Sequence, residues 1–217
     1  MNKGLVFFDV DHTIIRHSSG RHFAVLAIRK RVLSLRVLLV IPFFYLYYRF
    51  GNMTLNSIRK KYLFFKGLNK SELEALAMHN FRRNIKRAIY PKAAILIREL
   101  QSSGRRVVLA TSSLDIIVKP LMDYLGIRET LSTSLEFNQG VTTGRFEGMP
   151  LFESEKKRRV LDYIRQQGFT PGQCAFYSDS IHDLPLLAAV GKPVVVNPDA
   201  RLKRLAQRRG WEIIKFS

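Results

Sequence analysis

The sequence predicts an α/β fold in which a parallel β-sheet carries helices on both faces. Segments of strand type alternate with segments of helical spacing through most of the chain, a pattern typical of parallel sheets. Two apolar strand-type segments, Leu5–Phe8 and Cys174–Tyr177, run into acidic residues. A strongly basic segment follows the first of them. The 217 residues leave room for one domain of ordinary size plus such an insertion.

Each element after the insertion has a local signal. Tyr90 and Pro91 mark the return to the sheet, because proline suits the first turn of a helix. Gly126 and Gly168 are expected to stop helices. In chain order we expect a strand at Leu5–Phe8, a helix from Pro91 to Gly104, a strand at Val107–Ala110, a helix at Leu114–Tyr124, a β-hairpin within residues 131–146, a helix at Glu155–Gln167, a strand at Cys174–Tyr177, a helix at Leu184–Ala189, a strand at Pro193–Val196 and a helix at Ala200–Arg209.

The acids follow two of these strands. Asp9 and Asp11 point to the same face of an extended segment, because side chains alternate along a strand. Asp179 and Asp183 follow the strand at Cys174–Tyr177. Either motif alone could be a polar strand end with turn-forming acids. The two together predict a site in the crevice at the carboxyl ends of the strands, with oxygen ligands that suit Mg²⁺.

The motifs resemble those of the haloacid dehalogenase-like phosphatases, in the branch that includes phosphoserine phosphatase. The matching residues are Asp9, Asp11 and Thr13 in a D-x-D-x-T pattern, Thr111 after a strand, a lysine in a later helix, and the final acids Asp179 and Asp183. The resemblance covers essentially the whole chain. The C-terminal half is similar to a bacterial subgroup that contains phosphatidylglycerophosphate phosphatases. The implied fold is a Rossmann-like core, residues 1–15 and 88–217, with an inserted helical cap, residues 16–87.

The resemblance also implies a mechanism. Asp9 is expected to attack phosphorus and become an aspartyl phosphate, while Asp11 gives and takes the proton. The substrate's phosphoryl group is expected to contact Thr111, Ser112 and Lys156. The expected cofactor is Mg²⁺, held by Asp9, the main-chain carbonyl of Asp11, Asp179 and Asp183.

Three features depart from the family pattern. His12 stands where the residue is usually small, and Ser178 stands where glycine is usual. The phosphate-binding lysine is either Lys156 or Lys157, and the spacing to the last motif favours Lys156.

Charge is concentrated in the expected cap. The chain has 36 Lys and Arg against 17 Asp and Glu, a net charge of +19. Between Arg16 and Tyr90 there are 16 Lys and Arg and only two acids, Glu72 and Glu74, so this segment carries +14 of that charge. The same segment contains Val37–Tyr48, an uncharged aliphatic and aromatic run.

The run at Val37–Tyr48 has two interpretations. It is too short to span a membrane, which takes about 20 apolar residues, and Pro42 interrupts it. It is either buried inside the cap or in contact with an anionic membrane surface, where the flanking basic residues would also bind. The single cysteine, Cys174, is expected to be a buried inert thiol.

Three functions follow as expectations. The first is a phosphatase of a membrane phospholipid monoester, of the phosphatidylglycerophosphate or lysophosphatidate type. The second is a soluble phosphatase of a small metabolite such as phosphoserine. The third is a nucleic-acid-binding protein. The calculated pI near 10.5 permits this function, but it leaves the paired acids unexplained.

We expect no specific nucleic-acid or protein partner. The start Met-Asn-Lys lacks a signal peptide, so we expect a cytoplasmic enzyme, peripheral on the inner face of the membrane.

Overall fold

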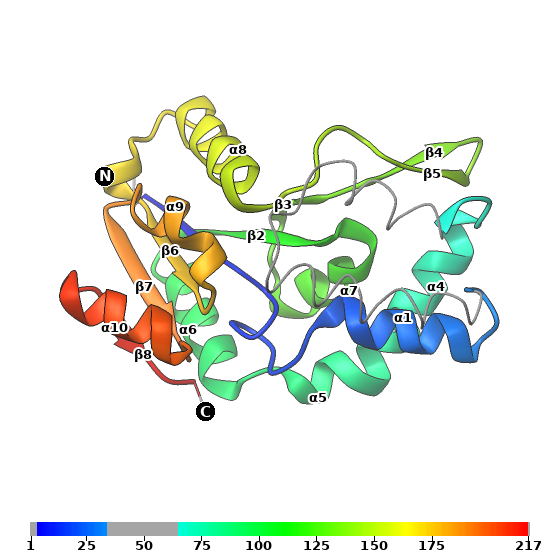
Figure 1. Cartoon of the computed structure of the whole chain (residues 1–217), viewed down its shortest axis with the longest axis horizontal. Helices are drawn as coiled ribbons and strands as arrows, with labels where there is room; N and C mark the ends of the chain where they lie inside the picture. Colours follow the sequence, from blue (N-terminus) through cyan, green and yellow to red (C-terminus); the bar gives the residue numbers. More distant parts are fainter. Residues whose placement is uncertain (1–3, 34–64, 217) are drawn as a thin grey trace.

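A computed structural model describes residues 4–33 and 65–216 of the chain. Its main sheet is parallel and has six strands in the order β3-β2-β1-β6-β7-β8 (Figure 1). The strands are β1 (Leu5–Phe8), β2 (Arg106–Leu114), β3 (Glu129–Thr133), β6 (Ala175–Ser178), β7 (Lys192–Val196) and β8 (Glu212–Ile214). The parallel α/β class predicted from the sequence is confirmed.

Helices cover both faces of this sheet because side chains alternate along each strand. Val6 and Phe8 of β1 pack on one face with α6 and α7, whereas Leu5 and Phe7 pack on the other with α8, α9 and α10. Neither face reaches water, so β1 is apolar at every position. The helices are α6 (Pro91–Ser102), α7 (Asp115–Leu125), α8 (Glu153–Gln166), α9 (Leu184–Leu187) and α10 (Ala200–Arg208), with short 3₁₀ turns at Pro171–Gln173 and Ile181–Asp183.

The inserted segment is helical where the structure describes it. Its elements are α1 (Ser19–Arg29), α4 (Lys70–Asn80), a π-helical turn at Phe81–Ile85 and α5 (Lys86–Ala88). The chain leaves and rejoins the sheet side by side, since Arg16 N donates to Ala88 O and Tyr90 N donates to Ile14 O at 2.9 and 3.0 Å. The division into a core and a cap at residues 16–87 stays a proposal.

A hairpin reaches from the core to the inserted segment. Its strands are β4 (Leu135–Asn138) and β5 (Val141–Phe146), and Figure 1 shows its tip beside the start of α4. Lys70 N donates to Gly140 O, and Thr142 N donates to Leu68 O, at 2.8 and 2.9 Å. A third apolar cluster joins α1 and α4 to the start of α7 and to this hairpin. The inserted helices therefore share their core with the rest of the molecule.

Two local expectations need correction. The hairpin is shorter than expected, because residues 129–133 form β3, a parallel neighbour of β2. Strand β2 also continues beyond Ala110, and Thr111 lies where its register with β3 shifts between Ala110 and Leu114. The added pairing of Leu114 with Thr133 extends this strand. The strand β8 was not expected, and at three residues it has too little pattern to be recognised.

Candidate functional site

The acids of both motifs lie at the carboxyl ends of two neighbouring strands. Asp9 follows β1, Asp179 follows β6, and the two strands pair in parallel. Asp9 N donates to Tyr177 O at 2.9 Å, which extends this pairing to the first acid itself. Ligands of open α/β sheets bind at this edge.

The ammonium of Lys156 lies between two buried carboxylates. Its Nζ is 2.8 Å from Asp9 Oδ1 and 2.8 Å from Asp183 Oδ2. Lys156 is only 3% exposed although it lies on α8, whose other basic residues are partly or fully exposed. Lys157, the alternative left open by the sequence, is partly exposed on the same helix. Lys156 is therefore the lysine that reaches the acids.

The third acid is held by a threonine of the first motif. The Thr13 hydroxyl donates to Asp179 Oδ1 at 3.1 Å and accepts from Asp179 N at 3.0 Å. Thr13 is fully buried, so these two bonds fix the loop after β1 against the loop after β6. Asp9 and Asp179 are thereby held in fixed relative positions.

Asp11 faces the inserted segment. Its Oδ1 accepts from Ser19 N, at the start of α1, at 2.9 Å. Its Oδ2 is 3.2 Å from the Ser113 hydroxyl, which also lies 2.9 Å from Ser19 Oγ. A hydroxyl both donates and accepts, so the contact with Ser113 suits either protonation state of Asp11. Sequence reasoning missed Ser19 and Ser113, because neither belongs to an acidic motif.

The two departures from the family pattern have different surroundings. Ser178 is fully buried, and its hydroxyl donates to Asp183 Oδ2 at 2.7 Å while accepting from Ser180 N at 3.1 Å. His12 is exposed and has a positive φ of 60°, a left-handed conformation that histidine tolerates better than bulkier residues do. Ser178 thus contacts Asp183 directly, whereas His12 is exposed to solvent.

The remaining predicted residues lie on β2. Thr111 is buried, and its Oγ1 accepts from Ser113 N at 3.2 Å, a bond that does not use the hydroxyl proton. Ser112 is exposed, and its main-chain carbonyl accepts from the Thr133 hydroxyl at 3.2 Å.

The acids are crowded, and this crowding changes their proton affinities. Burial raises the pKa of Asp9 well above its usual value; Lys156 opposes that rise, whereas the charges of Asp183 and Asp179 add to it. Burial also raises the pKa of Asp179, to about 6. Burial alone would lower the pKa of Lys156, but Asp183 and Asp9 raise it, so the lysine stays charged. Asp9 and Asp183 thus share one ammonium, and the third carboxylate, Asp179, is bonded to Thr13 instead.

This excess of negative charge fits a divalent cation. Within residues 4–33 and 65–216, no three acidic, histidine or cysteine side chains form a ready metal cage. Mg²⁺ does not need one, because it is usually held by one or two carboxylates together with water and substrate phosphate oxygens. The carboxylates of Asp9 and Asp179, which follow the neighbouring strands β1 and β6, offer oxygen donors of this kind.

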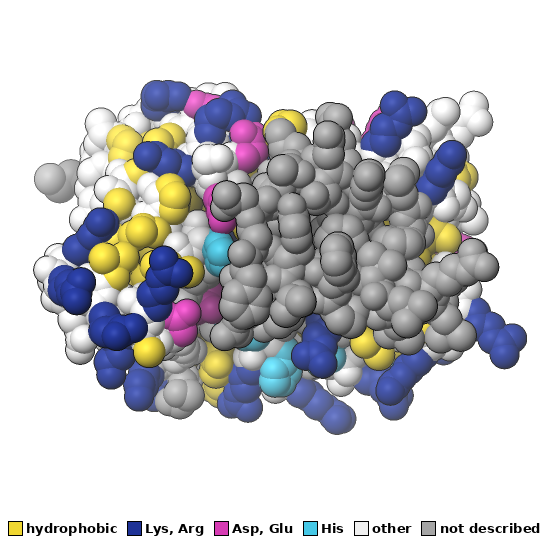
Figure 2. Space-filling model, in the orientation of Figure 1, with side chains coloured by type: hydrophobic (Ala, Val, Ile, Leu, Met, Phe, Trp, Pro, Cys, Tyr) yellow, Lys and Arg dark blue, Asp and Glu magenta, His cyan; other side chains and the backbone are white. Residues whose placement is uncertain are grey.

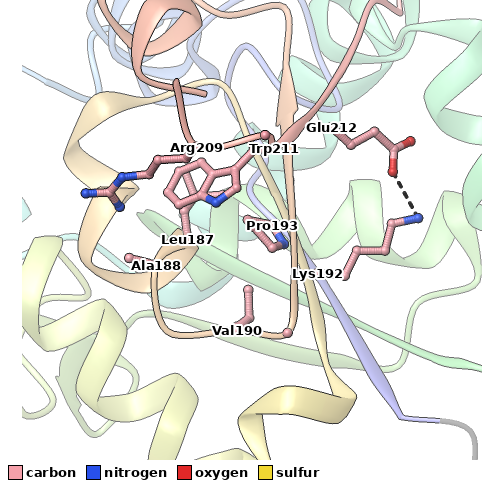
Figure 3. Close-up of a pocket in the computed structure, with 10 residues that line it drawn as sticks. Leu187, Ala188, Val190, Lys192, Pro193, Arg209, Trp211 and Glu212 are labelled. Atoms are coloured by element: carbon pink, nitrogen blue, oxygen red, sulfur yellow. Dashed lines mark ion pairs between the residues drawn. The ribbon is translucent and has the colours of Figure 1, made fainter. Parts of the chain in front are cut away.

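A separate shallow pocket of about 640 Å³ lies at the opposite edge of the sheet. Its lining includes the amino ends of β7 and β8, and Figure 3 shows Arg209 and Trp211 beside the ion pair of Lys192 with Glu212. Since the strands are parallel, this edge is the one away from Asp9 and Asp179. The pocket is therefore no part of the acidic site.

Comparisons with known proteins found a matching family and several relatives. The family described as haloacid dehalogenase-like hydrolase matches residues 6–188. A phosphoserine phosphatase from Mycobacterium tuberculosis (strain ATCC 25618 / H37Rv) is 33% identical over 97% of this chain and 70% of its own length. A histidinol-phosphatase from Neisseria meningitidis serogroup C is 30% identical over 99% of both chains.

Solved structures show the same fold. A protein of unknown function from Bordetella pertussis Tohama I has a TM-score of 0.90 and 26% identity over 100% of both chains. A phosphoserine phosphatase solved as an analogue of its phospho-aspartyl intermediate has a TM-score of 0.71 and 20% identity, covering 100% of this chain and 95% of that one. The second likeness, at this identity, concerns the fold alone.

Proposed function

Since the chain belongs to the haloacid dehalogenase-like hydrolase family, we propose that it is a Mg²⁺-dependent phosphomonoester phosphatase that works through an aspartyl phosphate on Asp9. The observation that carries this proposal is the buried contact of Lys156 with both Asp9 and Asp183, at 2.8 Å each. Burying several carboxylates around one ammonium is unfavourable for folding, so this cluster is better explained by chemistry than by stability. Phosphoryl transfer does need fixed acids and positive charge at one point.

The reaction divides between Asp9 and Asp11. A carboxylate oxygen of Asp9 attacks phosphorus, and the bond from phosphorus to the alcohol oxygen breaks. Asp11 gives its proton to the departing alkoxide. Asp11 then takes a proton from water, whose oxygen attacks the same phosphorus and releases phosphate and the free Asp9 carboxylate.

The other side chains hold charge and geometry. Lys156 offsets the negative charge of the phosphoryl group, and the hydroxyl proton of Thr111 donates to one of its oxygens. Ser112, the next residue along β2 after Thr111, is exposed. When bound, Mg²⁺ would supply further positive charge beside the phosphoryl oxygens, with Asp9, Asp179 and the Asp11 carbonyl as protein ligands and Asp183 next to them.

The substrate we favour is a small soluble phosphomonoester. The relatives are named for phosphoserine and histidinol phosphate, which supports the metabolite reading over the phospholipid reading favoured by the sequence. None of the matches reported above names a phosphatidylglycerophosphate phosphatase.

A phospholipid monoester stays the second candidate. Its support is the net charge of +14 between Arg16 and Tyr90 and the uncharged run Val37–Tyr48, which lies outside the described residues. In the described part of the chain, no helix is long and apolar enough to cross a bilayer. Dark blue Lys and Arg side chains predominate among the charged groups on the face in Figure 2. This charge would favour an anionic membrane surface, which we keep as the proposed partner of this second candidate.

One panel of substrates tests the function. The purified protein would be assayed with an aryl phosphate, phosphoserine, histidinol phosphate and lysophosphatidate, each with Mg²⁺ or a chelator and with or without anionic vesicles. We expect Mg²⁺-dependent turnover of the aryl phosphate and of at least one soluble metabolite. Turnover restricted to lysophosphatidate in vesicles would favour the second candidate, and no turnover of any ester would contradict the proposal.

A further inference from the structure

Strand β2 is irregular where it reaches the site. Its register against β3 shifts between Ala110 and Leu114, so that β2 has more residues in this stretch than β3 has. Irregularities of this kind are common next to active sites, where they re-aim side chains. Ser113 lies in the stretch, and its hydroxyl is 3.2 Å from the carboxylate of Asp11. The irregularity therefore brings a hydroxyl of the core against the second acid of the first motif.

Three polar contacts meet at Ser113. Its hydroxyl donates to Asp11 Oδ2 at 3.2 Å, and the Ser19 hydroxyl lies 2.9 Å from the same serine oxygen. When the Ser19 hydroxyl donates, Ser113 accepts that bond and still has its own proton to give to Asp11. The main-chain N–H of Ser113 donates to Thr111 Oγ1 at 3.2 Å. Ser113 thus joins Asp11 to Thr111, the residue expected to contact the phosphoryl group.

A second bond reaches Asp11 from the inserted segment. Ser19 is the first residue of α1 and is only 2% exposed, and its main-chain N–H donates to Asp11 Oδ1 at 2.9 Å. The core therefore holds one oxygen of this carboxylate and the inserted helix holds the other. Bonds to both oxygens fix the orientation of the side chain. A general acid needs such a fixed orientation, because it has to lie within hydrogen-bond reach of the oxygen that it protonates.

We propose that Ser113 and Ser19 are positioning residues that hold the Asp11 carboxyl group in the orientation from which it gives its proton to the departing alkoxide. This inference rests on the proposed phosphatase function and adds to it two residues that belong to neither acidic motif. Both serines act through Asp11 and need no contact with the substrate. Loss of their bonds should therefore weaken proton donation and leave the attack by Asp9 in place.

Leaving groups of different basicity separate proton donation from the rest of the reaction. The esters 4-nitrophenyl, 4-chlorophenyl and phenyl phosphate are similar in shape. The 4-nitrophenolate ion leaves readily without a proton, whereas the more basic phenolate ion gains much more from one. The quantity to compare is kcat/KM, because it reports the steps up to the transfer of the phosphoryl group to Asp9 and excludes the later hydrolysis, which is common to the three esters.

Ser113→Ala removes the hydroxyl, and Asp11→Asn, which removes the acid itself, is the reference variant. In Asp11→Asn the loss of kcat/KM should grow from the 4-nitrophenyl to the phenyl ester. Ser113→Ala should show the same trend in weaker form. We expect its kcat/KM to fall by roughly tenfold or more for phenyl phosphate and by about twofold or less for 4-nitrophenyl phosphate, because general acid catalysis contributes about a hundredfold or more. Ser154→Ala, which replaces an exposed serine, should behave like the wild type.

A matched pair of variants tests the bond from α1. Ser19→Ala keeps the main-chain N–H, whereas Ser19→Pro replaces its hydrogen with a ring carbon and cannot donate to Asp11. Proline suits this position, because Ser19 is the first residue of the helix and Ser18 before it is extended, with φ −72° and ψ 120°. We expect Ser19→Pro to show the trend of Ser113→Ala across the three esters, and Ser19→Ala to show it much less.

The outcomes separate this inference from the function on which it rests. A wild type that hydrolyses none of the three esters with Mg²⁺, or an Asp11→Asn protein that loses the same factor for each ester, would overturn the proposed mechanism itself. If Asp11→Asn shows the trend, a Ser113→Ala protein with a uniform loss or no loss would overturn the role of Ser113, since a merely structural defect affects all esters alike. Equal kinetics of Ser19→Pro and Ser19→Ala would overturn the role of Ser19. If Ser113→Ala does not fold, the pair at Ser19 decides alone.

Discussion

Lys156 Nζ lies 2.8 Å from Asp9 Oδ1, although 147 residues separate the two in sequence. The same nitrogen lies 2.8 Å from Asp183 Oδ2, so one ammonium joins the acids of the first and last motifs. The contact requires the start of α8 to lie at the carboxyl ends of β1 and β6, while the rest of the helix packs on one face of the sheet. The packing of the core therefore determines which charged groups meet at the site.

Replacing Lys156 should damage both stability and turnover. In Lys156→Met two buried carboxylates lose their shared cation, which should lower the free energy of unfolding by about 3–5 kcal/mol. Turnover of an aryl phosphate should fall by about a hundredfold or more. Lys157→Met is the matched control, because Lys157 is partly exposed one residue away, and it should behave like the wild type. Thermal unfolding and steady-state kinetics of both variants would decide.

If Lys156→Met fails to fold, Lys156→Arg retains the charge and allows the assay. Equal kinetics in the wild type, Lys156→Met and Lys157→Met would exclude Lys156 from the site.

Ser178 should orient Asp183. In Ser178→Ala the buried Asp183 carboxylate loses one donor and Ser180 N loses its acceptor, at a cost of about 1–3 kcal/mol in the free energy of unfolding. The Mg²⁺ concentration for half-maximal turnover should rise, because Asp183 is less well fixed. Ser154→Ala, exposed on α8, is the control for a serine lost without a buried contact. Unchanged stability and Mg²⁺ dependence in Ser178→Ala would contradict this role.

Asp179 should make the metal-free protein less stable as pH rises. Its pKa is raised from 3.8 to about 6 by burial, so the folded state disfavours its charged form. The stability from this group is complete below pH 4 and is lost as pH rises through about 6. Asp179→Asn cannot ionise at this position. In a chelator at pH 8 its free energy of unfolding should therefore exceed that of the wild type by on the order of 1–3 kcal/mol, and it should melt at a higher temperature.

At pH 4 the difference between Asp179→Asn and the wild type should vanish. Mg²⁺ should stabilise the wild type at pH 8 and the variant much less. Melting curves at pH 4, 6 and 8 with and without Mg²⁺ would show this, and a wild type that is the more stable protein in chelator at pH 8 would contradict it.

The basic cap should bind anionic vesicles through residues Arg29–Arg49, most of which lie outside the described residues. High salt should weaken this binding without abolishing it, since the Debye length falls to about 3 Å at 1 M while apolar burial persists. Replacing Phe43, Phe44 and Tyr47 with Ser should remove the salt-resistant part. If the run is cap core instead, the same triple variant should melt earlier. Co-sedimentation and thermal unfolding distinguish the two, and no sedimentation at low salt would exclude the membrane contact.

The main sheet could be predicted because its signals are local. The apolar runs before Asp9 and Asp179, and the glycines at 126 and 168, mark strands and helix ends through short-range rules. Strand β8 escaped these rules because three residues carry too little pattern, and β3 was taken as part of the hairpin that follows it. The end of β2 was misplaced because its last pairing, Leu114 with Thr133, is made with β3.

The acids of the site could be predicted as a group, but their partners could not. Ser19 and Ser113 have no sequence signal, since a serine is as common in a turn as beside a carboxylate. Their contact with Asp11 exists because α1 begins beside the carboxyl end of β2, where Ser113 lies. Lys156 differs from these serines, because motif spacing favours it over Lys157, and its burial then distinguishes it from its basic neighbours Lys157, Arg158 and Arg159.

The central claim is that Asp9 carries the phosphoryl group during turnover. Its most direct test is mass spectrometry of protein quenched in acid during steady-state hydrolysis of an aryl phosphate with Mg²⁺, for the wild type and for Asp9→Asn. We predict a phosphoryl group on the peptide that contains Asp9 in the wild type, and neither that adduct nor measurable turnover in a folded Asp9→Asn protein. Substantial turnover by pure Asp9→Asn, or an adduct on another residue, would contradict the mechanism.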